Sequence, residues 1–203
     1  MFVEDRNGRF SPWQRIINPN VGRFTEPFLK YMTFEVPDTT YDWRTFDFVE
    51  DLSKVEWLRR IIDATDPDLR RFRDHGGKML MYFGWADPAL SPLRGVRYYE
   101  TVLDEMGAST TDFFRLFMVP GMFHCGGSVG VNRFEYEGDR SSWFSNFLEA
   151  WVEEGVPPEQ LLGLRVEQDS VLWTRPICLY PRVARYTGRG DSNDAANFEC
   201  VDA

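Results

Sequence analysis

Two short, largely apolar segments, Lys78–Phe83 and Phe113–Val119, most constrain the fold of this chain. Such runs, bounded by glycine and polar residues, predict strands that are buried on both faces of a parallel sheet. Asp87 follows the first segment and His124 follows the second. Functional groups of open parallel sheets gather at the carboxyl ends of the strands. We therefore expect both side chains at one edge of the sheet, within hydrogen-bonding reach.

Helical patterns surround these two segments. Ser53–Glu56 has the form of a capping box ahead of an apolar stripe, and Pro67 restarts a short helix. A helix is predicted from Pro92 to Met106, and aromatic residues at helical spacing predict another over 143–152. The alternation predicts an α/β fold, a parallel sheet with flanking helices. Two strands leave both outer edges unpaired, so we expect further strands from outside this chain or from another chain.

Residues 1 to about 50 show no sustained periodicity. Prolines at positions 12, 19, 27 and 37 are scattered among aromatic residues. This pattern predicts irregular structure, such as a cap or the tail of another unit. We therefore divide the chain into residues 1–50 and a main domain of residues 51–203.

Composition excludes several classes of partner. The 203 residues carry a formal net charge of −9, which disfavours nucleic acid and acidic membrane surfaces. No apolar run approaches the ~20 residues of a membrane helix, and the N-terminus shows no signal-peptide pattern.

The aromatic content of 16% fits a ring-binding cleft, although filling of the core is the more common use of large aromatics. The sequence contains no CxxC motif and no His/Cys cluster, so we expect no metal site of the zinc type.

An aspartate that accepts a hydrogen bond from an imidazole fixes its tautomer and stabilises the imidazolium, as in a Ser-His-Asp triad. Asp87 and His124 occur in the acid-then-histidine order of α/β-hydrolases. Two structural alternatives remain, because Asp87-Pro88 is also a common helix start and His124 is compatible with a buried, hydrogen-bonded histidine. The G-x-S-x-G string at 126–130 follows a histidine loop rather than a strand, so Ser128 is not the expected nucleophile.

Four stretches of the sequence together resemble the tannase/feruloyl esterase family. They are GGKMLMYFGWADP at 76–88, FMVPGMFHCGG at 117–127, TRPICLYP at 174–181 and DAANFEC at 194–200. Members of this family are secreted α/β-hydrolases with a large lid, and they cleave esters of aromatic acids. The resemblance implies a secreted or periplasmic location for this chain and a small aromatic ester as its substrate.

The resemblance also implies roles for individual residues. It makes Asp87 the triad acid and His124 the general base, and it makes residues 1–50 the last part of the lid and residues 51–203 the C-terminal part of the hydrolase domain. Leu90 lies three residues beyond Asp87, and from its position in the loop alone we expect it to face the ring of a bound acid.

The odd number of cysteines, three, fits the same resemblance. Family members join the cysteine after the histidine, here Cys125, to a cysteine just before the nucleophilic serine, and no such upstream partner exists in this chain. Cys178 and Cys200 resemble the C-terminal bridge of the family. The alternative for these two residues is a pair of free thiols.

The chain departs from the family in one large respect. It contains no Cys-Ser-x-Gly-Gly elbow, and the oxyanion-hole residues and the calcium loop of the lid are also missing, so we expect no cofactor in this chain. The expected function is a serine-type carboxylic ester hydrolase whose serine lies outside the chain, leaving this chain alone inactive. The alternative is a non-catalytic module with a vestigial site that binds phenolic ligands. A third possibility is a triad completed by a separate chain or by the missing N-terminal portion of the same protein.

Overall fold

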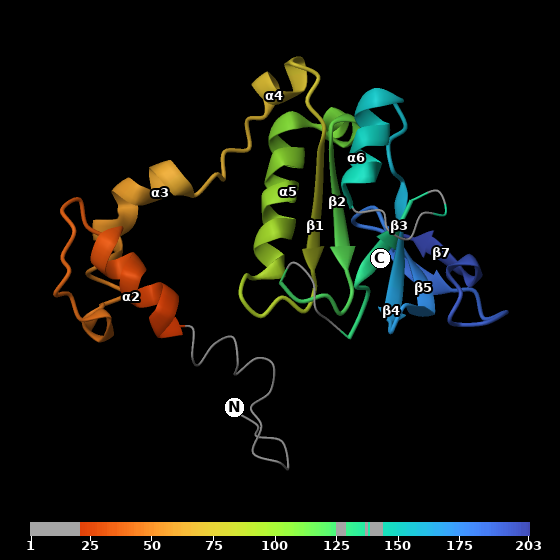
Figure 1. Ribbon diagram of the computed structural model, residues 1–203. Helices are drawn as coiled ribbons and strands as arrows, with labels where there is room; N and C mark the ends of the chain where they lie inside the picture. The colour runs from red at the N-terminus through yellow and green to blue at the C-terminus, as the bar shows by residue number, and fades with distance from the viewer. Residues whose placement is uncertain (1–20, 125–128, 137, 139–143) are drawn as a thin grey trace, which may run out of the picture. The chain divides into compact units, whose positions relative to one another are not determined.

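The structure, a computed structural model, describes residues 21–124, 129–136, 138 and 144–203 (Figure 1). The chain divides between Asp66 and Pro67 into two compact units, and each is described by itself below. No helix in these described ranges is long and apolar enough to cross a membrane.

The first unit contains helices and turns. Its elements are α2 (Val21–Tyr31), the 3₁₀ turns η1 (Trp43–Thr45) and η2 (Leu52–Val55), and α3 (Glu56–Ile62). Leu29 of α2 and Leu58 of α3 are buried, and the Trp57 indole donates a hydrogen bond of 2.9 Å to the Thr33 carbonyl.

Two expectations about this region are wrong. The helix α2 occupies residues that we expected to be irregular, and it includes Pro27. Proline inside a helix removes one backbone hydrogen bond, but burial of a neighbouring apolar side chain, here Leu29, offsets that loss. The predicted capping box is also absent, because Ser53 lies within η2 and its hydroxyl donates to the Glu50 carbonyl at 3.1 Å. The helix α3 starts at Glu56 without a side-chain cap.

The centre of the second unit matches the predicted order of elements. After α4 (Arg70–Asp74), β1 (Met79–Gly84) pairs in parallel with β2 (Phe114–Val119). The helix α5 (Pro92–Met106) joins the two strands, and α6 (Phe144–Glu153) follows later in the chain. Figure 1 shows α5 beside β1 and α6 on the other side of the strand pair. The predicted parallel pair with helices packed on it is therefore confirmed.

The alternation of side chains along the strands builds two separate cores. Phe114, Leu116 and Met118 of β2 pack with α5 through residues such as Tyr99 and Val102. The intervening residues of β2 face the other way and pack with α6 in a second core, which contains Phe117, Val119, Phe144 and Phe147. All six residues of β2 are buried, as expected of a strand that is covered on both faces.

The remaining strands of the described residues all pair antiparallel, which corrects the prediction that a parallel sheet dominates the fold. One sheet contains β3 (Arg133–Glu135), β4 (Gln160–Glu167) and β5 (Ser170–Cys178) in that order. A second contains β6 (Val183–Tyr186) and β7 (Phe198–Val201). Short 3₁₀ turns, η3 (Ala108–Asp112) and η4 (Ala195–Asn197), precede β2 and β7. The β4–β5 hairpin turns at Gln168 and Asp169, both at positive φ, as a tight two-residue turn requires.

The antiparallel part also reaches the edge of the parallel pair. Phe117 of β2 forms an antiparallel bridge with Leu179, and the Tyr180 N–H donates to the Leu116 carbonyl at 2.9 Å. One edge of β2 is therefore partly covered from within this chain, whereas we expected any cover to come from elsewhere. On the far side of β1, no strand of the described ranges is paired.

A disulfide joins the end of β5 to β7. Cys178 and Cys200 are bonded, with their Cα atoms 5.7 Å apart. The pairing is the one that the family resemblance implies, and it closes the segment that contains the β6–β7 hairpin.

Candidate active site

The loop after β1 holds Asp87 in a buried position, and both oxygens of its carboxylate form hydrogen bonds. Oδ1 of Asp87 accepts the N–H groups of Ala89 and Leu90 at 2.8 and 3.0 Å. Oδ2 lies 2.9 Å from Nδ1 of His124, which follows β2. The two carboxyl-end loops of the parallel pair thus bring together the acid and the imidazole that the sequence indicated.

The surroundings of Asp87 favour its charged form. Burial acts to raise the pKa of this carboxyl, but the hydrogen bonds from the Leu90 N–H, His124 and the Ala89 N–H outweigh it and lower the pKa below its ordinary value. The carboxylate is therefore ionised at neutral pH. An ionised partner at Nδ1 orients the imidazole and stabilises the imidazolium when the ring takes up a proton.

The two side chains differ sharply in exposure. The side chain of Asp87 is 4% exposed, whereas that of His124 is 47% exposed. Since Nδ1 of His124 is engaged by Asp87, Nε2 is the ring nitrogen that can take a proton from another group. His124 is therefore not a histidine sealed within the core, which was one of the structural alternatives.

Backbone contacts hold the two loops against each other. The Trp85 N–H donates to the Val119 carbonyl at 3.0 Å, and the Ala86 N–H donates to the Met122 carbonyl at 3.1 Å. A Cβ at Gly84 would lie 2.2 Å from the Met122 carbonyl oxygen, which is closer than any real contact. The end of β1 thus approaches the histidine loop so closely that only glycine fits.

A second glycine crowds the same loop. A Cβ at Gly130 would lie 2.2 Å from the Pro120 carbonyl oxygen. The sequence analysis missed the roles of Gly84 and Gly130, although a glycine at the end of an apolar strand, as at Gly84, is a signal of close backbone approach.

Two apolar side chains near Asp87 are open to solvent. Leu90 is 55% exposed, so a ligand can contact its side chain, while its backbone N–H donates to Asp87. Trp85 is 43% exposed and was not singled out from the sequence. Cys125 and Ser128 lie outside the described residues.

The expectation that this chain holds no cofactor stays a prediction for the residues that the structure describes. Within them, no three His, Cys, Asp or Glu side chains gather as a metal site requires. The acidic side chains of the first unit are instead engaged locally: Asp38 binds Thr40, Asp42 binds Arg44, and Asp51 binds Lys54.

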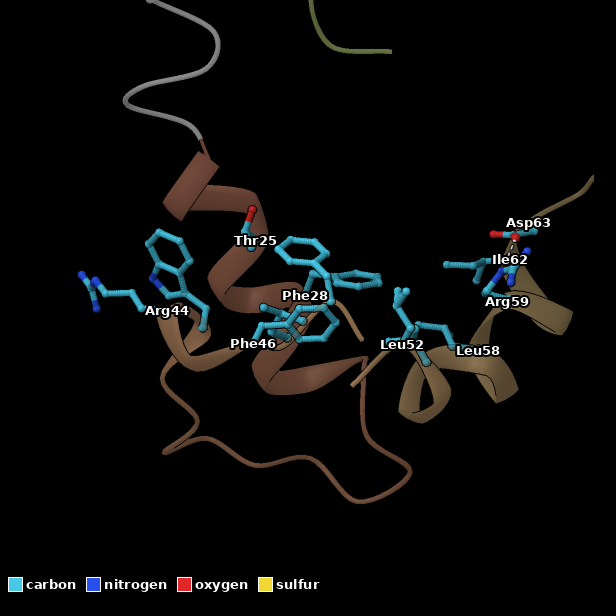
Figure 2. Close-up of a pocket in the computed structure, with 13 residues that line it drawn as sticks. Thr25, Phe28, Arg44, Phe46, Leu52, Leu58, Arg59, Ile62 and Asp63 are labelled. Carbon is cyan, nitrogen blue, oxygen red and sulfur yellow. Dashed lines mark hydrogen bonds and ion pairs between the residues drawn. The ribbon is translucent and has the colours of Figure 1, made fainter. Parts of the chain in front are cut away.

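An apolar pocket of about 480 Å³ lies within the first unit. Figure 2 shows Phe28 and Phe46 in its middle, Arg44 at one end, and the ion pair of Arg59 with Asp63 at the other. Further apolar walls come from Leu29, Trp43, Phe48, Leu52, Val55, Leu58 and Ile62. The pocket has the size and lining typical of a site for a small aromatic molecule.

Comparison with known proteins decides the family. The family model described as tannase and feruloyl esterase matches residues 12–201. The chain belongs to the tannase and feruloyl esterase family. The resemblance seen in the sequence is thereby confirmed.

Individual proteins, one of them with a solved structure, are also similar to this chain. An uncharacterised esterase of Xanthomonas campestris is 35% identical over 87% of this chain and 36% of its own length. The mono(2-hydroxyethyl) terephthalate hydrolase of Piscinibacter sakaiensis is 44% identical over 73% of this chain and 23% of its own length. The crystal structure of feruloyl esterase B from Aspergillus oryzae superposes with a TM-score of 0.77 at 29% identity, over 87% of this chain and 36% of that one. The chain thus spans between about a quarter and just over a third of the length of these proteins.

Proposed function

We propose that this chain is the acid–base portion of a carboxylic ester hydrolase that acts on esters of aromatic acids. The observation that carries the proposal is the 2.9 Å contact between Asp87 and Nδ1 of a half-exposed His124. The nucleophilic serine comes from a part of the protein outside these 203 residues, because no Cys-Ser-x-Gly-Gly elbow occurs among them. The finer assignment to feruloyl or galloyl esters is part of the same proposal.

The reaction follows from the geometry of this pair. Nε2 of His124 accepts the proton of the serine hydroxyl as the oxygen attacks the ester carbonyl, while Asp87 holds the ring by Nδ1 and stabilises its positive charge. The imidazolium then gives its proton to the departing alcohol, leaving an acyl-serine. A water molecule, deprotonated by the same nitrogen, attacks the acyl group, and the aromatic acid leaves as the serine recovers its proton.

The substrate class draws on the named relatives. Feruloyl esterase B of Aspergillus niger, 31% identical to this chain, and the terephthalate-ester hydrolase both carry names that specify esters of aromatic acids. The exposed apolar side chains of Trp85 and Leu90 beside the acid loop suit the ring of such an acid. The Cys178–Cys200 disulfide suits an oxidising compartment, and we propose secretion or a periplasmic location.

The test compares this chain with a longer form of the protein that carries the serine elbow. We expect the longer form to hydrolyse methyl ferulate or methyl gallate, and the 203 residues alone to release no acid. In the longer form, His124→Ala should lower kcat by at least about a thousandfold, because the general base is lost. Turnover by the 203 residues alone, or full activity of the His124→Ala variant, would refute the proposal.

The proposed role of Leu90 is tested in the same longer form. Leu90→Asp should raise KM for methyl ferulate, because a charge would face the ring of the acid, while the backbone N–H that binds Asp87 is retained. Hydrolysis that is unchanged in this variant would remove Leu90 from the substrate site.

The pocket in the first unit favours a second candidate, a non-catalytic module that binds phenolic ligands (Figure 2). In that case methyl ferulate should bind the 203 residues without being cleaved. Phe46→Ala in the pocket should weaken binding, whereas Val36→Ala, at a residue 80% exposed and outside the pocket, should not. The DNA upstream of Met1 discriminates between the candidates, because an in-frame Cys-Ser-x-Gly-Gly elbow favours the enzyme and a stop codon with a ribosome site favours the module.

A further inference from the structure

A second pocket, of about 390 Å³, lies in the second unit, and its lining does not include Asp87, Leu90 or His124. Its walls come from the antiparallel strands and from the start of the loop after β2. The lining residues that matter here are Gly121, Val131, Trp173, Arg175, Ile177 and Phe198. All of these walls belong to the second unit.

Arg175 is the cation of this pocket, and it stacks on aromatic rings. Its guanidinium carbon lies 5.1 Å from the centroid of the Trp173 ring and 4.3 Å from that of Phe198. One of its N–H groups donates to the Thr174 carbonyl at 2.6 Å. Burial lowers the pKa of Arg175, and the more distant charge of Asp191 acts in the opposite direction.

Arg175 also lacks an acidic partner, unlike other arginines of the same unit. Arg115, Arg165 and Arg185 each form an ion pair with a glutamate at 2.6 to 2.9 Å. Among the residues that the structure describes, no carboxylate lies within 4.0 Å of the Arg175 guanidinium. A partly buried guanidinium with free N–H groups is well suited to a planar anion, which it can bind through two parallel hydrogen bonds.

The strand opposite Arg175 is covered by two apolar side chains that line the pocket. Gly163 of β4 is paired with Arg175 of β5. A Cβ at Gly163 would lie 2.7 Å from the Val131 side chain and 3.1 Å from that of Ile177, which are the apolar walls of the pocket. These two residues are only 1% and 2% exposed, so the walls are fixed parts of the core.

We propose that this pocket binds a small planar carboxylate of the benzoate class. The carboxylate pairs with the guanidinium of Arg175, and the ring lies against Ala184 and Phe198, two of the more exposed apolar residues of the lining. We expect the ligand to carry a negative charge because Arg175 is a cation without an acidic partner among the described residues. We expect the rest of the ligand to be apolar because the other walls of the pocket are apolar. The proposal does not depend on the proposed esterase reaction.

The test titrates the ¹⁵N-labelled chain, carrying His124→Ala, with sodium benzoate and with benzamide, its neutral counterpart of similar shape. We expect saturable amide shifts at Gly121 and Ala184 with benzoate, and at least about tenfold weaker binding of benzamide, since it cannot form the ion pair. The His124→Ala background keeps the outcome independent of whether the chain is part of an esterase.

Variants of the two arginines provide the matched comparison. Arg175→Met keeps the length and the contact with the rings but removes the charge, and should weaken benzoate at least about tenfold, to the level of benzamide. Arg185→Met, in the neighbouring β6 and paired with Glu199 in the native chain, should leave benzoate binding unchanged. If Arg175→Met fails to fold, Arg175→Lys keeps the charge and should weaken benzoate through loss of the planar fork.

Three outcomes would overturn the proposal. They are benzoate binding to Arg175→Met with undiminished affinity, shifts confined to residues 21–66, and no saturable shift at benzoate concentrations of about 10 mM.

Discussion

At the scale of single residues, Asp87 performs two tasks with one carboxylate. One oxygen fixes the backbone of its own loop through Ala89 and Leu90, and the other orients His124. The sequence left open whether Asp87 was a turn-forming residue or a catalytic acid. The structure shows both kinds of contact at once, because the two oxygens point to different partners.

The lowered pKa of Asp87 predicts how stability depends on pH. A carboxyl with a pKa below its unfolded value of 3.8 stabilises the fold fully above that value and loses its contribution as pH falls through the folded pKa. The free energy of unfolding should therefore drop between pH 6 and pH 2.5, and the drop should be smaller in Asp87→Asn. Urea denaturation at both pH values measures this. Asp104→Asn, on an exposed part of α5, is the control, and equal drops in both variants would contradict the prediction.

Asp87→Asn should also reduce the activity of the longer form of the protein, which carries the serine. Asp87→Asn should lower kcat for methyl ferulate by about 10³- to 10⁴-fold, because an amide neither fixes the required tautomer of His124 nor stabilises its charge. Steady-state kinetics measure kcat and KM separately. A change in KM alone would show that Asp87 acts on binding rather than on the chemical step.

At the scale of elements, the end of β1 and the loop after β2 act as one assembly. Gly84→Ala should push the Met122 carbonyl away and destabilise the fold by about 2 kcal/mol, since backbone atoms cannot give way easily. It should also weaken the contact between His124 and Asp87, which the NMR signal of the Nδ1 proton reports.

Gly95→Ala in α5 is the matched control for Gly84→Ala. A Cβ at Gly95 would meet the ring of Phe83 at 2.8 Å, and a side chain can turn aside. Alanine is also favoured within a helix by about 1 kcal/mol. We expect a smaller change in stability and an unchanged Nδ1 signal. If both variants alter this signal equally, Gly84 has no special role in placing the histidine loop.

The disulfide ties the β6–β7 hairpin to β5, which is also an effect between elements. Replacing Cys178 and Cys200 together by serine should lower the free energy of unfolding by roughly 3 kcal/mol, by the loop-entropy model. Hydrogen exchange should show lost protection in β6 and β7 and retained protection in β1 and β2. Equal loss throughout the second unit would mean that the bridge supports the whole core rather than the hairpin.

At the scale of the whole molecule, the chain divides at Asp66–Pro67, whereas the sequence suggested a boundary near residue 50. The structure places η2 and α3 in the first unit, because Leu58 and Val55 line the same apolar pocket as Leu29 of α2. The assignment of the first unit to a lid stays a prediction.

This division predicts that the second unit folds without the first. Both of its hydrophobic cores and its disulfide lie within residues 67–203. Limited proteolysis should cut first within residues 63–69, which lack regular structure. A chain of residues 67–203 should retain the hydrogen-exchange protection of β1, β2, β4 and β5. Loss of protection in β1 and β2 would contradict this prediction.

Local patterns in the chain were enough to predict β1, β2 and α5, and with them the loops of Asp87 and His124. The reason is that strand and helix periodicity, glycine stops and a proline at a helix start act over a few neighbouring residues. The pairing of β3 with β4 was beyond such reasoning, because it joins segments that are far apart in sequence. The approach of Gly84 to Met122 and the stacking of Arg175 on Phe198 likewise exist only when distant segments meet. Long-range packing alone brought these groups together.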